Sequence, residues 1–370
     1  MNFDFSDDAK ALGEQARKFL AERAGPAKAR AAMADSAPPH DAALWQSIVE
    51  LGWTAARVPE AHGGLGLSAE ESAMLAEACG HHLACVPLVS HLLATEALLI
   101  AGSPEQQARL FPALADGSRI AVPAWNEPGS ISPLSVHTAA IDHALSGNAL
   151  TGIKAPVADL PSAHLAIVAA AGLEGTSLWI VDLAAAKTES LETLDLVRRH
   201  GRLTLAGTPA EPLGTHADYL LWLDRAAVIL AFEAMGTAAA AMAMTVEYAK
   251  TRVAFGQTIG RYQGVKHKCA DMYIKLELAR AHALHGLATL EAGGPELAQA
   301  ASAARVASLD ALGFTVEEAV QLHGGIGFTW ESDCQFYYRR GRTLTAALGA
   351  KAFWADRLVR ALELRNRAAA

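Results

Sequence analysis

The spacing of apolar residues changes twice along this chain of 370 residues, and these two changes constrain the fold most. In the first 115 residues apolar side chains recur every three or four positions, which predicts helices. From about Gly117 to His216 the chain has short β-rich runs separated by Gly, Pro and Asn. Helical spacing then returns. The order predicts an α+β protein with an N-terminal α-helical domain (1–116), a small middle β domain (117–218) and a C-terminal helical bundle (219–370).

The longest helical pattern covers Asp224–Lys250, about 27 residues or ~40 Å of helix at about 1.5 Å per residue. A helix of that length is typical of a bundle. A dinucleotide-binding α/β domain is disfavoured, because the strands do not alternate with helices and no G-x-G-x-x-G links a strand to a helix.

Composition and charge exclude some partners. Hydrophobic residues make up 52% and charged residues 19%, against about 45–50% and about 25% in typical soluble domains. The excess predicts buried subunit contacts. The formal net charge of −8 argues against a surface that neutralises phosphates, so no nucleic acid is expected.

The cellular compartment is predicted from cysteines and apolar stretches. The four cysteines are scattered and none has the C-x-x-C spacing of metal or redox sites, which favours free thiols and no metal. The acidic start, residues 1–8, is unlike a signal peptide. Glu233 and Gly236 interrupt the apolar stretch Ala226–Met244, so it is not expected to span a membrane. We expect a cytoplasmic protein.

A corner between two helices is the most informative segment. The first helix ends near Arg252, Phe255-Gly256 makes a turn, and the next helix begins near Arg261, so Arg252 and Gln263 can flank one corner between the helices. The guanidinium of Arg252 could donate two parallel hydrogen bonds to a pyrophosphate, or it could form a salt bridge with the next helix. Spacing alone leaves both open.

Five segments in the same order resemble the acyl-CoA dehydrogenase family. The corner matches R-x-x-F-G-x-x-I-x-x-x-Q, and a later segment is similar to Q-x-x-G-G-x-G-F. The five segments are Val58–Leu67, Trp125–Ser130 (in weakened form), Arg252–Gln263, Gln321–Thr329 and Tyr338–Arg340.

The resemblance implies helical, β and four-helix domains around FAD, oxidation of an acyl-CoA thioester between Cα and Cβ, oligomers, and electron-transfer flavoprotein as acceptor. It places Arg252 and Phe255 at the FAD corner and Gln263 by the ADP part. It brings Gln321, Gly324 and Gly325 to the adenine across a subunit interface. Two adjacent glycines let the backbone approach a ligand, although they could equally form a plain turn that ends a helix.

The family's catalytic base is missing from its usual position. The reaction needs a group that removes the α-proton, usually a glutamate. Nine residues after Arg339, where that glutamate is expected, the chain has Leu348, and no Asp or Glu occurs from Cys334 to Ala355. Within the family, His323 could touch cofactor, or it could be a satisfied histidine at the interface.

Some family members carry the glutamate on the first long C-terminal helix, at the position of Asp224. An aspartate reaches ~1 Å less far, and misplacement on that scale can cost ~10²-fold in rate. Alternatively, Asp224 is a residue at the start of a helix that pairs with Arg225 or water. Glu233, nine residues on, faces the opposite side of the helix, and a structural ion pair is expected for it.

The family's W-I-T motif, which packs against the flavin, is also absent, because Ala155-Pro156-Val157 follows Lys154. The chain therefore resembles the base-lacking subunit of bacterial α2β2 acyl-CoA dehydrogenases that act on steroid side chains. Three hypotheses stay open: an FAD-binding subunit of a heteromer whose partner carries the glutamate, a non-catalytic subunit that completes the partner's FAD site, and a homo-oligomer with Asp224 as base. A flavin monooxygenase of related fold is conceivable, but no sequence feature selects it.

Overall fold

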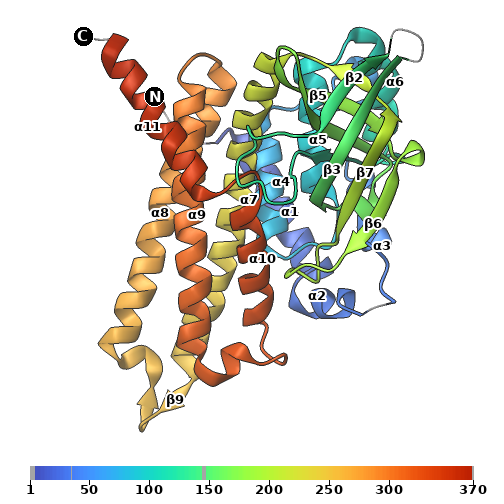
Figure 1. Ribbon diagram of the computed structural model, residues 1–370. Helices are drawn as coiled ribbons and strands as arrows, with labels where there is room; N and C mark the ends of the chain where they lie inside the picture. Colours follow the sequence, from blue (N-terminus) through green and yellow to red (C-terminus); the bar gives the residue numbers. More distant parts are fainter. Residues whose placement is uncertain (1–4, 35, 144–146, 369–370) are drawn as a thin grey trace.

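The computed structural model describes residues 5–34, 36–143 and 147–368. The first four residues of the acidic start lie outside this part of the chain. A helical N-terminal part and a β-sheet lie on one side of a bundle of long helices (Figure 1). The N-terminal helices are α1 (Asp7–Arg23), α2 (Pro26–Ala32), α3 (Ala42–Glu50), α4 (Ala69–His81), α5 (Leu88–Ala101) and α6 (Pro104–Ala115).

The sheet is mostly antiparallel and runs in the order β6-β7-β3-β2-β4-β5-β8, while β1 pairs with β4 in parallel. Helix α5 packs against β1 and α7 against β5, so the sheet shares its core with both helical parts. The strands are β1 (Ala121–Ala124), β2 (Ala139–His143), β3 (Gly147–Ala158), β4 (Leu165–Gly172), β5 (Gly175–Asp182), β6 (Lys187–Leu191), β7 (His200–Pro209) and β8 (Glu211–Leu213).

The C-terminal part is a bundle of long helices. Between α7 and α8 lies a short hairpin, which is labelled at one end of the bundle in Figure 1. The elements are α7 (His216–Thr251), β9 (Val253–Ala254), β10 (Gln257–Thr258), α8 (Gln263–Ala292), α9 (Leu297–His323), α10 (Cys334–Ala346) and α11 (Lys351–Ala368).

Helix α7 joins the parts, because α4 and α9 both pack against it. It begins at His216 rather than at Asp224, since Thr215 and Asp218 form a capping box there. By length and composition α7 could cross a membrane, but most of its apolar stretch is buried inside the protein, as in the core helix of a soluble protein. The predicted fold class is confirmed, whereas the exact domain limits stay a prediction.

Helices α4 and α7 cross at glycine contacts. A Cβ on Gly80 would lie 2.1 Å from the carbonyl oxygen of Glu233, and a Cβ on Gly236 would lie 2.0 Å from that of Glu77. Neither position has room for a side chain. The crossing brings Glu233 of α7 close to the N-terminal helices, next to the site described below.

Candidate functional site

A cavity of about 290 Å³ lies where the three parts of the protein meet. Its walls come from α5, β1 and the segment after it, the end of β3, the segment between β6 and β7, α7, and the connection from α10 to α11. The lining includes Ser90, Leu93, Trp125, Asn126, Pro156, Arg198, His200, Trp222, Leu230 and Leu348.

Leu348 occupies the cavity wall at the position where the family has its glutamate. Its side chain is buried, its φ is +59°, and its carbonyl oxygen accepts a hydrogen bond from Nε1 of Trp354 at 2.8 Å. Within the described residues no Asp or Glu lines this cavity. The cavity therefore has no carboxylate that could remove a proton.

The segment that contains Glu127 is held by a buried ion pair. The Glu127 carboxylate accepts hydrogen bonds from the backbone N–H of His137 and Thr138, at 2.7 and 2.8 Å, and from Nζ of Lys154 at 2.6 Å. Burial opposes ionisation of Glu127, but the Lys154 ammonium and the bonds to Thr138 outweigh it and lower the pKa to about 2. Burial lowers the pKa of Lys154 to about 8. This pair fixes one wall of the cavity.

Asp224 does not line the cavity. Both of its carboxylate oxygens accept hydrogen bonds from Arg357 of α11, one of them at 2.9 Å. Burial raises the pKa of Asp224 above its usual value even with Arg357 beside it. Arg225, the partner expected from the sequence, binds Glu96 of α5 instead. The expected pairing with Arg225 is wrong, because Arg357 comes from a helix more than a hundred positions away.

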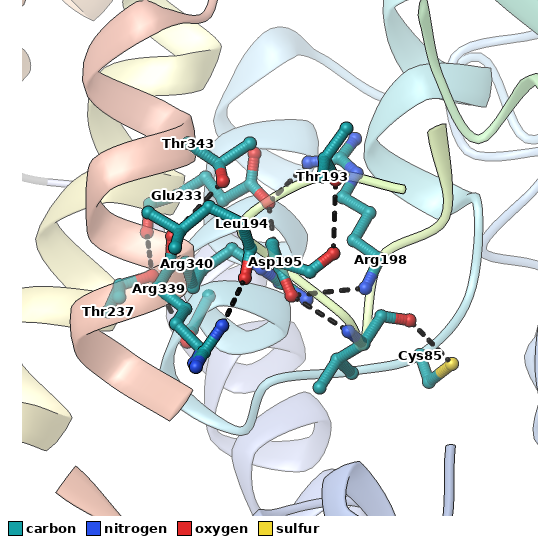
Figure 2. A network of polar contacts seen from close by, with 12 residues as sticks. Cys85, Thr193, Leu194, Asp195, Arg198, Glu233, Thr237, Arg339, Arg340 and Thr343 are labelled. Atoms are coloured by element: carbon teal, nitrogen blue, oxygen red, sulfur yellow. Dashed lines mark hydrogen bonds and ion pairs between the residues drawn. The ribbon is translucent and has the colours of Figure 1, made fainter. Parts of the chain in front are cut away.

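Glu233 belongs to a buried ion cluster, drawn in Figure 2, so the expected ion pair is confirmed. Arg198 donates from Nη1 to Glu233 at 3.0 Å, from Nε to Asp159 at 2.9 Å and from Nη2 to the Ser90 hydroxyl at 2.9 Å. Arg340 of α10 binds a further carboxylate in the same cluster. The cluster joins α5, the sheet, α7 and α10 beside the cavity.

The cluster's other acid, Asp195, shows why sequence reasoning missed this group. Its carboxylate binds Arg340 and the backbone N–H of Val197, the latter at 2.9 Å. Burial would raise the pKa of Asp195, but Arg340 outweighs it and the pKa lies below its usual value. The charged residues of the cluster come from four separate stretches of sequence, at Asp159, Asp195–Arg198, Glu233 and Arg340. The one signal in the sequence is that charged residues lie close together around Arg198 in a chain that is otherwise rich in apolar residues.

The residues expected at the FAD corner lie on the hairpin end of the bundle. Arg252 follows the last residue of α7, and its side chain is exposed and has no hydrogen bond or ion pair among the described residues. Phe255 has a φ of +53° and is 97% exposed. Gln263 is the first residue of α8. The expected turn at Phe255 is confirmed, and the salt-bridge alternative for Arg252 finds no support within the described chain.

The glycine segment lies at the same end of the bundle. The ring of Tyr248 in α7 stacks on that of His323 at 4.3 Å, which places the end of α9 next to the hairpin end of α7. His323 is buried and its Nδ1 donates to the Ala319 carbonyl at 2.7 Å. Gly324 ends α9 with a φ of +63°, and both it and Gly325 are exposed.

Gln321 lines a second cavity, of about 370 Å³, together with Phe328, Trp330 and Arg339. The structure thus gathers five of the predicted cofactor residues at the exposed end of the bundle, with Gln321 one turn before the glycines. Asp224 and Leu348 do not belong to this group.

Two family models match the chain: the acyl-CoA dehydrogenase N-terminal domain at residues 6–118 and the C-terminal domain at 220–363. Acyl-CoA dehydrogenase IpdE2 of Mycobacterium tuberculosis is 33% identical over 335 residues, 90% of this chain and 91% of that protein. The chain therefore belongs to the acyl-CoA dehydrogenase family. Members are flavoproteins and oxidoreductases that act on CH–CH bonds of acyl-CoA.

Two solved structures are similar over nearly the whole chain. The Tcur3481-Tcur3483 steroid ACAD has a TM-score of 0.91 and 30% identity and covers 98% of this chain and 99% of that chain. The ChsE4-ChsE5 complex from Mycobacterium tuberculosis has a TM-score of 0.90 and 24% identity, with 98% and 99% covered. The second likeness concerns the fold alone.

Proposed function

We propose that this chain is one subunit of a heteromeric acyl-CoA dehydrogenase and that a partner subunit carries the catalytic glutamate. The observation that carries the proposal is the cavity at the family's catalytic position, which has Leu348 in its wall and no carboxylate. The names of two similar structures support a heteromer, because each joins two chains. The substrate is an acyl-CoA thioester with a bulky acyl group, such as a steroid side chain.

The fit to FAD differs between the two ends of the cofactor. At the flavin end, Pro156 and Val157 stand where the family has its flavin-packing motif, and about 290 Å³ cannot hold a flavin with an acyl group stacked on it. At the other end, Arg252 offers an unpaired guanidinium on the surface. The residues fit the ADP part and not the flavin ring.

This chain therefore contributes to FAD that is bound mainly by the partner. Arg252 and Phe255 would hold the pyrophosphate corner with Gln263, while Gln321, Gly324 and Gly325 would hold the adenine side. FAD held in this way would supply the hydride acceptor for the β-carbon, and electron-transfer flavoprotein would be the electron acceptor of the complex. The four cysteines are free, which supports a cytoplasmic location.

A self-sufficient homo-oligomer with Asp224 as base is the weaker candidate. Arg357 binds both oxygens of that carboxylate, and Asp224 does not line the cavity. A general base must reach the proton that it removes. The geometry therefore supports a structural role for Asp224.

The test is the FAD content of the chain purified alone and after co-expression with an acyl-CoA dehydrogenase encoded beside it. We expect yellow protein only from the co-expressed complex. Arg252→Ala should lower the FAD-to-protein ratio of that complex, whereas Arg365→Ala, which changes an exposed arginine near the end of α11, should not. If the chain alone holds stoichiometric FAD that an acyl-CoA bleaches, the heteromer is wrong and Asp224 becomes the leading base.

A further inference from the structure

Segment 324–333, which follows α9 and begins with the two glycines, has little buried surface of its own. Its large apolar side chains are exposed: Ile326 to 48%, Phe328 to 81% and Trp330 to 55%. Of its first five residues only Gly327 is buried. A surface segment with so few buried apolar contacts keeps one conformation only where other groups hold it.

Arg30, on the short helix α2 of the N-terminal part, binds this segment at three points. Its Nη1 atom donates to the carbonyl oxygen of Trp330, and its Nη2 atom donates to the carbonyl oxygen of Glu331 at 3.2 Å and to Oδ1 of Asp333 at 2.8 Å. The guanidinium carbon also lies 5.1 Å from the centre of the Phe336 ring in α10. One planar group with a fixed fork of donors thus holds three positions of the chain at once.

Helix α2, which carries Arg30, is itself fixed to the rest of the protein. Ala29 of this helix is 1% exposed. At the end of the helix, Nη2 of Arg199 donates to the carbonyl oxygen of Ala32 at 2.8 Å. Arg30 therefore reaches the segment from an anchored base.

Two residues of α10 hold the same part of the segment from the other side. Nε2 of Gln335 donates to the carbonyl oxygen of Trp330 at 2.7 Å, so this oxygen accepts from both Arg30 and Gln335. The guanidinium of Arg339 lies 4.6 Å from the centre of the Trp330 ring. With its backbone and its ring both held, Trp330 keeps its place in the wall of the second cavity, which Gln321 also lines.

We propose that Arg30 is a positioning residue for the FAD site: it fixes segment 324–333 in the conformation in which Gly324 and Gly325 meet the shared cofactor. The inference rests on the proposed function, because it adds a residue to the same site. The hydrogen bonds of Arg30 go to the far end of the segment, so Arg30 acts through the segment rather than on the cofactor. Holding a binding segment in its bound conformation reduces the entropy lost on binding, which raises affinity and leaves the chemical step unchanged.

The first arm of the test measures hydrogen exchange in the chain purified alone, without FAD. The backbone N–H groups of Thr329 and Ser332 donate to carbonyl oxygens inside the segment, at 3.0 and 3.3 Å. We expect Arg30→Ala to make exchange at these two amides about tenfold faster, because the segment opens more readily without its bonds to Arg30. Arg109→Ala, which removes an exposed ion pair with Glu211, should leave this exchange unchanged. Equal exchange in Arg30→Ala and in the unchanged chain would overturn the proposal.

The second arm titrates FAD into the co-expressed complex after the cofactor has been removed. Arg30→Ala should raise the Kd for FAD about tenfold and leave turnover per bound FAD unchanged. Arg109→Ala should change neither. Faster exchange with an unchanged Kd would overturn the proposal, because the segment would then not position the cofactor site. If the unaltered complex holds no FAD, the proposed function has failed and the assignment to FAD falls with it, whereas the first arm still decides whether Arg30 holds the segment.

Two further variants separate the shape of the guanidinium from its charge. Arg30→Lys keeps the charge but lacks the fork, so it should behave like Arg30→Ala in both arms. Asp333→Asn leaves both carbonyl oxygens bound, so it should change exchange and Kd by about threefold at most. Full rescue by Arg30→Lys would contradict the three-point contact. Denaturant unfolding of Arg30→Ala should match that of Arg109→Ala, since both remove exposed ion pairs, and this comparison confirms that the variant is folded.

Discussion

At the scale of single residues, Leu348 separates this chain from a complete dehydrogenase. We expect Leu348→Glu to place a carboxylate at the cavity, since Leu348 already lines it. The variant should still not reduce a dye with acyl-CoA when purified alone, because Pro156 and its neighbours do not form a flavin site. Leu348→Gln serves as the control. Turnover by the glutamate variant but not by the glutamine variant would show that only the base was missing.

Asp224→Asn tests the role of the other carboxylate. Arg357 would lose its ionic partner inside the protein, which should cost roughly 2–3 kcal/mol of the free energy of unfolding. Turnover of the co-expressed complex per bound FAD should not change. The exposed pair of Asp356 with Arg360 gives the matched control, since Asp356→Asn should cost less than about 0.5 kcal/mol. Lost turnover with unchanged stability would favour catalysis by Asp224.

Some features of these residues could be predicted from the sequence and others could not. The motif around Arg252 could be found because its spacing is local, and the turn at Phe255 follows from the same segment. The missing glutamate at Leu348 could be found by counting. The partner of Asp224 could not, because Arg357 reaches it from α11.

At the scale of elements, the crossing of α4 and α7 depends on the absence of side chains. Gly236→Ala would place a Cβ 2.0 Å from the Glu77 carbonyl oxygen, and the helices would have to separate. We expect a loss of about 3 kcal/mol in the free energy of unfolding, measured with denaturant. Gly313→Ala in α9 is the control, because nothing lies within 4 Å of its Cβ. That variant should gain up to about 1 kcal/mol. Equal effects would contradict the tight crossing.

Helix α5 carries a pH-dependent contribution to stability. Burial lowers the pKa of His91 to about 4, below its value of about 6.5 in an unfolded chain. The contribution of His91 to the free energy of unfolding is therefore present above pH 6.5. It is lost as the pH falls toward 4, because the unfolded chain binds the proton first. Between pH 7 and 5 the unfolding free energy should fall by about 2 kcal/mol from this residue alone. His91→Gln should remove that part of the pH dependence, and an unchanged slope would contradict it.

Most elements could be predicted, because each depends on local periodicity. Helices α1 to α6 lie within the first 115 residues, and strands β1 to β8 lie between Gly117 and His216, as the spacing of apolar residues predicts. Helix α7 begins before Asp224, where the pattern of apolar residues predicts its start. The capping box at Thr215 sets the earlier start, and no change in the spacing of apolar residues marks it. The order of strands in the sheet could not be predicted either, because β1 pairs with β4 across long intervening segments.

At the scale of the whole molecule, large apolar side chains lie exposed around the hairpin end of the bundle. Phe255 is 97% and Phe328 is 81% exposed, and Trp330 lies on the wall of the second cavity. Apolar residues that gather on one surface mark an interaction site. The same surface carries Arg252 and the two glycines, so assembly and FAD binding should depend on one another.

Phe328→Asp tests this dependence in the co-expressed complex. A carboxylate on the apolar surface would have to be desolvated in the assembled state, so the complex should dissociate at least tenfold more readily in sedimentation velocity. It should lose FAD in the same proportion, because the cofactor site spans both subunits. Leu173→Asp, at an exposed position on the far β4–β5 turn, should change neither. Dissociation without loss of FAD would mean that one subunit binds the cofactor alone, and the shared site would then be wrong.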